Sequence, residues 1–221
     1  MPMGSCLPRL FSATLAVAAC SAADDIGLPP DAGGDAPGSP VDAADAASAV
    51  FVDSRDDQSY PTISIGDQTW LARNLDYDIA GSSFCYDDEA ANCEADGRLY
   101  LWSVAPTACP PGSHLGSDDE WKDLETAVGM ASNQLDLEGY AVVRGTDEGT
   151  TLKASDGFAA RMAGYRTGTT YDALDDRTYF WTDTLPATNV WRRRIEAATP
   201  TVFRFTNAPE GFAISVRCIL D

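Results

Sequence analysis

One short stretch of the chain contains the residue types that catalytic and metal sites use. The stretch CPPGSHLGSDDEW, from Cys109 to Trp121, holds the single histidine of the chain, His114, with one cysteine, two serines and three acidic residues. Serine, histidine and a carboxylate form the triad of acyl-transfer enzymes, and histidine with cysteine binds zinc. A triad needs a third group that orients the histidine, and zinc needs further nitrogen or sulfur ligands. The chain has no second histidine, so we expect no catalytic residue and no metal here.

The acidic residues of this stretch have a sufficient role at the start of a helix. Ser117 and Glu120 are spaced as a capping box, in which each side chain satisfies a backbone N–H of the first turn. Apolar residues then recur at helical spacing until Gly129. Carboxylates in a first turn also favour the positive end of the helix dipole. The sequence therefore predicts a capped helix, beginning just after His114.

The first twenty residues have the features of an export signal. An apolar run from Leu10 to Cys20 is too short to span a bilayer, and it ends in VAAC, which resembles the bacterial lipobox. A plain signal peptide, cleaved nearby with Cys20 incidental, is the alternative. We interpret residues 1–19 as a lipoprotein signal peptide and Cys20 as the lipidated residue. The protein would then be lipid-anchored in the bacterial cell envelope, at the outer membrane, facing the periplasm or the surface.

Residues 20–50 have the composition of a flexible tether. This segment is rich in Asp, Ala, Pro and Gly and nearly free of large apolar residues, so it cannot bury enough surface to fold. We predict that it is a disordered acidic linker between the lipid and a domain at residues 51–221.

The charge of the chain narrows the choice of partners. All 34 acidic residues follow Cys20, whereas one of the 15 basic residues precedes it, so the mature chain carries 14 − 34 = −20. Nucleic acid is excluded as a partner, because binding it requires a basic surface. Acidic clusters at Asp87–Glu89 and Asp175–Asp176 keep structural calcium open as an alternative, although no EF-hand spacing appears. We expect no other cofactor, and the oligomeric state is left open.

Four cysteines remain after the signal and lipobox: Cys85, Cys93, Cys109 and Cys218. An even number in an exported domain predicts two disulfides, for which three pairings exist. The short loop CYDDEAANC favours Cys85 with Cys93, which leaves Cys109 to pair with Cys218.

The domain has the patterning of mixed secondary structure. YPTISIGDQTWLARNL alternates on both sides of Gly66-Asp67, which predicts a β-hairpin. GRLYLWSVA is compatible with a strand or a short helix. Several later segments, among them RTYFWTDTL, VWRRRIEA, TVFRFT and GFAISVRCIL, are β-like. We therefore predict an α+β domain with one or two helices on a small, irregular antiparallel sheet.

Taken in order, these motifs resemble the Fibrobacter succinogenes major paralogous domain family. The resemblance rests on IGDQTWLARNLDYD, SSFCYDDEAANCEADGRLYLWSVA, CPPGSHLGSDDEWKDL, LKASDGF, AGYRTG, YFWTDT and GFAISVRCILD, and it covers about residues 51–221. It implies a C-type-lectin-like fold with a long disulfide from Cys109 to the last strand. The Glu-Pro-Asn and Trp-Asn-Asp motifs of calcium-dependent lectins are missing.

The resemblance and the anchor together suggest a non-catalytic binding or adhesion module, with a glycan or an envelope protein as its partner. Similarity to formylglycine-generating-enzyme-like domains provides an enzyme alternative, which would require a spare pair of cysteines. A calcium-stabilised structural surface protein is the third hypothesis.

Candidate binding residues lie in and near NVWRRRIEA. As a strand, this segment places Arg192 and Arg194 on one face and Trp191 and Arg193 on the other. We consider Arg192 and Arg194 a candidate anion-binding patch, with Trp181 and Trp191 as aromatic surfaces for a sugar ring. The alternatives are that the tryptophans are core residues and that the arginines pair with carboxylates or lie on a solvated edge strand.

Overall fold

The computed structural model describes residues 49–186, 189–207 and 211–221. The expected signal peptide, Cys20 and nearly all of the tether lie outside these residues. All of the described residues belong to one compact unit.

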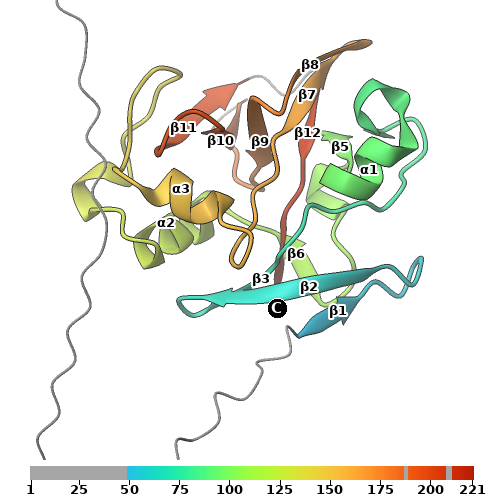
Figure 1. The fold of residues 1–221 in the computed structure, drawn as a ribbon, viewed down its shortest axis with the longest axis horizontal. Helices are drawn as coiled ribbons and strands as arrows, with labels where there is room; N and C mark the ends of the chain where they lie inside the picture. The colour runs from blue at the N-terminus through green and yellow to red at the C-terminus, as the bar shows by residue number, and fades with distance from the viewer. Residues whose placement is uncertain (1–48, 187–188, 208–210) are drawn as a thin grey trace, which may run out of the picture. The chain divides into compact units, whose positions relative to one another are not determined.

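Two sheets build this unit, and they lie one above the other in Figure 1. The smaller sheet has the order β1-β2-β3-β13-β6, with every pair antiparallel. Its strands are β1 (Val50–Val52), β2 (Ser59–Ile65), β3 (Gln68–Leu71), β6 (Ser113–Leu115) and β13 (Cys218–Leu220).

The larger sheet has the order β11-β10-β9-β7-β12-β5-β4, and β8 pairs with β7. Its strands are β4 (Ser83–Phe84), β5 (Leu99–Leu101), β7 (Ala163–Thr167), β8 (Thr170–Leu174), β9 (Arg177–Trp181), β10 (Val190–Glu196), β11 (Val202–Asn207) and β12 (Phe212–Ser215). Short parallel contacts of β9 with β7 and with β12 interrupt an otherwise antiparallel arrangement. Strand β10 is an interior strand between β9 and β11, so the edge-strand interpretation of the arginine run was wrong.

Three short α-helices occur in the described residues: α1 (Ala90–Asp96), α2 (Asp118–Ala127) and α3 (Glu148–Lys153). Three 3₁₀ turns accompany them: η1 (Tyr86–Asp88), η2 (Ala105–Thr107) and η3 (Ser132–Gln134). The sequence predicted one or two helices; α1 and α3 span only seven and six residues, too few for an apolar period to be recognised. The mixed α+β class is confirmed.

Two local predictions are confirmed by hydrogen bonds. Ser117 caps α2 with a complete capping box: its hydroxyl accepts from the Glu120 N–H at 3.1 Å, and the Glu120 carboxylate accepts from the Ser117 N–H at 2.7 Å. The hairpin joins β2 to β3 through Gly66, whose φ of +59° is a value that glycine adopts without strain. The GRLYLWSVA segment contains β5, and its last residue, Ala105, begins η2.

Side chains alternate between the two faces of the larger sheet, and each face contributes residues to a buried core. On β9, Tyr179 and Trp181 join a core shared with the smaller sheet, whereas Phe180 points to the opposite face. That opposite face packs against Trp121 and Leu124 of α2 and Leu152 of α3. Helices α2 and α3 lie together at one side of the unit in Figure 1, and α1 lies at the other.

Two disulfides fasten the unit, with the pairing that the sequence favoured. Cys85 is bonded to Cys93, with Cα atoms 4.9 Å apart, and Cys109 to Cys218, with Cα atoms 5.8 Å apart. Such bonds are consistent with an extracytoplasmic location. No helix in the described parts of the chain is long and apolar enough to cross a membrane.

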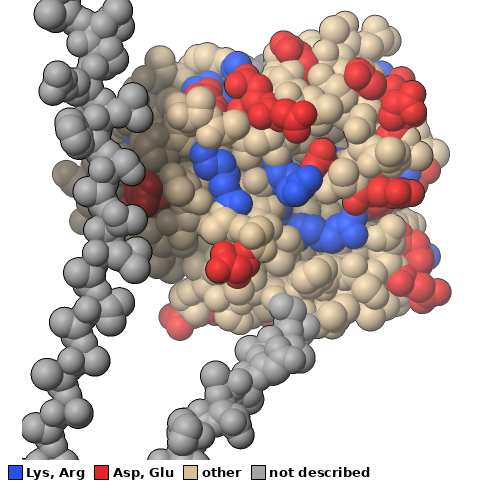
Figure 2. All heavy atoms as spheres, in the orientation of Figure 1, with Lys and Arg blue, Asp and Glu red and all other residues tan. Residues whose placement is uncertain are grey.

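Charged side chains are mixed on the surface. On the face drawn in Figure 2, a small group of basic side chains lies near the centre and acidic side chains surround it. Exposed charges of this kind mainly favour solubility.

Candidate binding site

A pocket of about 460 Å³ opens on the larger sheet, at the face that carries Tyr179. Its volume lies in the range of small-molecule sites, and most of its lining is aromatic. The lining comes from β7, β9, β10, β11, β12 and the loop that follows η3: Glu138, Gly139, Tyr140, Tyr165, Tyr179, Arg192, Phe205, Thr206 and Phe212.

Strand pairing brings the floor of this pocket together. Arg192 of β10 is the cross-strand partner of Phe205 on β11 and of Trp181 on β9. Because alternate residues share a face, Tyr179 and Arg192 project to the same side as Phe205. Each of these strands therefore contributes to one surface, although the residues are far apart in sequence.

The aromatic rings form a nearly continuous wall. Neighbouring ring centroids are 5.4 Å apart for Tyr140 and Phe205, 6.3 Å for Phe205 and Tyr179, 5.4 Å for Tyr179 and Tyr165, and 6.1 Å for Tyr165 and Phe212. Three of these contacts are edge-to-face, a favourable geometry that also holds rings in place. Burial and Asp172 raise the pKa of Tyr165 to about 12, so its hydroxyl stays protonated and donates to Asp172 at 3.0 Å.

Arg192 places a buried positive charge in this wall. Only 3% of the residue is exposed, and its guanidinium carbon lies 4.8 to 5.7 Å from the ring centroids of Phe205, Phe212, Tyr179 and Trp181. Nε and Nη1 have no hydrogen-bond partner within the described structure. Burial lowers the pKa of Arg192 to about 10, a value at which the side chain still carries its charge at neutral pH.

The other buried arginines have carboxylate or carbonyl partners, in contrast to Arg192. Arg144 binds Glu125, and Arg193 and Arg204 both bind Asp118, with N–O distances of 2.7 Å in each ion pair. Arg217 is fully buried without a carboxylate, but it donates to Asn74 and to the Leu71 and Phe158 carbonyls. A buried charge normally has such partners. Arg194 is also buried: its Nε lies 3.0 Å from the Glu196 carboxylate and its Nη2 donates to the Tyr140 carbonyl, although its Nη1 has no partner. Of the six buried arginines in the described residues, Arg192 alone has neither an ion pair nor a side-chain hydrogen bond.

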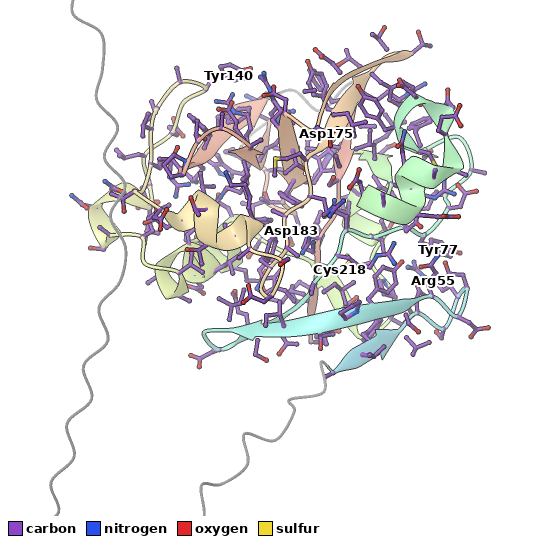
Figure 3. All side chains as sticks on the ribbon, in the orientation of Figure 1. Arg55, Tyr77, Tyr140, Asp175, Asp183 and Cys218 are labelled. Carbon is purple, nitrogen blue, oxygen red and sulfur yellow. A yellow bond between two sulfur atoms is a disulfide. The ribbon has the colours of Figure 1, made fainter. Side chains whose placement is uncertain are left out.

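The rim of the pocket is held by contacts from the same strands. Arg194 Nη2 donates to the Tyr140 carbonyl at 2.9 Å, and the Gly139 N–H donates to the Arg204 carbonyl at 3.0 Å. Tyr140 itself is 59% exposed, and Figure 3 shows it at the margin of the unit beside β11. The loop is therefore anchored through its backbone, while the Tyr140 ring remains accessible to a ligand.

The residues predicted as binding candidates do not lie together in one site. Arg192 and Arg194 share a face as expected, but Arg194 is already engaged by the Tyr140 carbonyl and lies 3.0 Å from the Glu196 carboxylate. Trp181 is fully buried and donates to the Tyr100 carbonyl, so it cannot stack on a ligand from the surface. Trp191 lies on the opposite face of β10 from Arg192, with the guanidinium of Arg204 3.5 Å from its ring. Only Arg192 belongs to the pocket.

Sequence reasoning missed the aromatic lining. Tyr179 and Phe205 alternate with core residues in RTYFW and TVFRFT, and this alternation was a usable signal once the strands were assigned. Tyr140 gave no signal, because its place at the rim depends on a loop whose path follows from long-range contacts.

His114 forms a second cluster, and together with Glu120 and Asp221 it lines a second, more open pocket of about 510 Å³. Its Nδ1 lies 2.7 Å from Asp221 Oδ1, and its Nε2 lies 2.8 Å from Glu120 Oε1. Although partial burial opposes the charged form, the hydrogen bonds to these carboxylates raise the pKa of His114. Both ring nitrogens already have carboxylate partners, so the arrangement ties β6 to α2 and leaves neither nitrogen free to act as a general base.

The acidic clusters considered for calcium are not gathered into a site. Asp88 accepts a hydrogen bond from the Tyr171 hydroxyl, and Asp176 pairs with Arg177 at 2.6 Å. Within the described ranges, no group of three or more His, Cys, Asp or Glu side chains is arranged to hold a metal ion.

Comparison with known proteins gives one match. The family model described as Fibrobacter succinogenes major domain matches residues 63–220. No curated protein and no solved structure matches the chain.

Proposed function

The chain belongs to the Fibrobacter succinogenes major domain family, and from that membership we propose that it is an exported, lipid-anchored, non-catalytic binding module. Its ligand site is the aromatic pocket defined by Tyr140, Tyr179, Arg192 and Phe205, and its ligand is a glycan of the cell envelope or the surroundings.

The observation that carries this proposal is the pocket itself. Its volume of about 460 Å³ accommodates a monosaccharide-sized group, and its rings offer apolar faces beside the tyrosine hydroxyls. The loop at the rim leaves Tyr140 exposed beside the opening.

The composition of the site supports binding over catalysis. The described lining holds one carboxylate, Glu138, and no histidine, cysteine or lysine. All four cysteines of the described chain are in disulfides, whereas the enzyme alternative requires a spare pair. Thiol titration of the mature native protein is expected to detect no free thiol, and two titratable thiols would favour the enzyme.

A glycan array probed with the purified full chain tests the binding function. The chain is expected to retain a subset of glycans, and Tyr140→Ala is expected to weaken retention at least fivefold. Val143→Ala is the matched control, because Val143 lies in the same loop, is 63% exposed and does not line the pocket. Equal losses in both variants, or no retention on any glycan, would contradict a glycan site at the pocket.

The anchor is tested separately, because Cys20 lies outside the described residues. Wild-type chain is expected in the membrane fraction and labelled by a fatty-acid probe. Cys20→Ser is expected to lose both the label and the membrane association, since attached acyl chains provide the binding free energy. Unchanged labelling in Cys20→Ser would rule out the anchor.

A further inference from the structure

The charge of Arg192 narrows the ligand class of the proposed pocket. We propose that the pocket selects a six-membered sugar ring bearing one carboxylate, a hexuronic acid, whose carboxylate pairs with the Arg192 guanidinium while the ring rests against the aromatic wall. This inference rests on the proposed binding function.

The first step is the absence of a counter-ion. Within the described residues, no carboxylate lies within ion-pair distance of Arg192, and its Nε and Nη1 have no hydrogen-bond partner. The nearby positive charge of Arg194 disfavours the charged form of Arg192 further. The surrounding rings stabilise a guanidinium through cation–π contacts, but these contacts do not replace the hydrogen bonds lost on burial. A carboxylate entering the pocket would supply both charge and acceptors.

The second step concerns the charge of the ligand. The mature chain carries a net charge of −20, and Glu138 adds an acid to the pocket lining. The electrostatic repulsion between these negative charges and an approaching anion increases with the charge of the anion. A single carboxylate is therefore better suited to the pocket than a doubly charged phosphate.

The third step concerns the ring. Phe205 and Phe212 provide apolar surface, while Tyr140, Tyr179 and Thr206 carry hydroxyl groups. A sugar ring has both an apolar face and hydroxyl groups, so it matches this mixture, whereas a simple aliphatic acid would leave the hydroxyl groups unmatched.

The test measures binding of galacturonate and glucuronate oligosaccharides to the full chain by isothermal titration calorimetry, with galactose and glucose oligosaccharides of equal length as neutral controls. The acidic sugars are expected to bind at least tenfold more tightly than the neutral ones. Methyl esterification of the carboxylates is expected to remove this preference on the wild-type protein, and this comparison does not depend on any variant folding.

Arg192→Met provides the protein-side test. We expect at least tenfold weaker binding of acidic sugars with an unchanged or higher melting temperature, because an apolar side chain of similar length replaces an unpaired buried charge. Arg166→Gln is the matched control: Arg166 is stacked 3.7 Å from the Phe84 ring on the same sheet, but it does not line the pocket. It is expected to bind acidic sugars as wild type does.

The outcomes separate the two proposals. If neutral and acidic sugars bind equally, or if Arg192→Met binds like wild type, the carboxylate selection is wrong and the glycan-binding function stands. If neither acidic nor neutral sugars bind at 10 mM ligand, both the carboxylate selection and the proposed glycan-binding function are wrong.

Discussion

Arg193 of β10 and Asp118 of α2 form a buried ion pair, with Nη1 and Oδ1 2.7 Å apart and no more than 3% of either residue exposed. Asp118 also binds Arg204, and Arg193 also binds Glu125, so one network fixes α2 on the sheet. The same arginines hold Asp118 in its charged form and keep its pKa well below the usual range, although burial acts in the opposite direction.

Replacing Asp118 by Asn should destabilise the domain strongly. The change leaves two buried guanidinium groups without their shared carboxylate, and losing one partner of a buried pair costs about 3–5 kcal/mol. Urea unfolding of Asp118→Asn should show this loss. Asp119→Asn is the control, because Asp119 is exposed at the same helix turn and should change stability by less than about 0.5 kcal/mol. Similar losses in the two variants would contradict the role of the network.

The His114 cluster should make stability depend on pH above neutrality. Because the folded pKa of His114 is raised above its ordinary value of 6.5, its stabilising effect is complete below pH 6.5 and is lost as pH rises through the folded pKa. Wild type should therefore be more stable than His114→Gln at pH 6, with the difference shrinking toward pH 9. Melting temperatures measured across that range test the sign, and a gap that widens with pH would refute it.

The two disulfides should differ in their effects on stability. Cys109–Cys218 joins residues 109 positions apart and Cys85–Cys93 joins residues 8 apart. In the chain-entropy model, they contribute roughly 4.8 and 2.6 kcal/mol. The double variant Cys109→Ser with Cys218→Ser should therefore lose more stability in denaturant than Cys85→Ser with Cys93→Ser. The reverse order would show that the unfolded-chain argument does not apply here.

Gly149 should not tolerate a side chain. A Cβ at this position would lie 2.4 Å from the Thr201 carbonyl oxygen and 2.8 Å from the Pro200 carbonyl oxygen, and both are backbone atoms. Gly149→Ala should cost about 1–3 kcal/mol through overpacking. Gly157→Ala is its control, since the nearest atom there lies at 3.8 Å. Circular dichroism melts compare the two, and equal melting temperatures would mean that the backbone adjusts.

Local features of the fold could be predicted from the sequence because they depend on interactions between residues that are close together in the chain. The capping box of Ser117 and Glu120 depends on residues three positions apart, and the hairpin at Gly66 depends on a turn and its flanking alternation. The short spacing of Cys85 and Cys93 favoured their pairing for the same reason. Family membership also followed from sequence, since the order of several short motifs is itself a sequence property.

The character of the binding site was decided by tertiary structure. Alternation placed Arg192 and Arg194 on one face of a strand, but it could not say that β10 is interior, that Trp181 is buried, or that Arg194 meets the Tyr140 carbonyl. Whether a buried charge is paired depends on the strands and loops beside it, which come from distant parts of the chain. Arg193 and Arg192 are adjacent in sequence, yet strand alternation directs Arg193 to Asp118 and Glu125 on one face and Arg192 into an aromatic pocket on the other. That difference in cross-strand surroundings makes one arginine structural and the other a candidate for binding.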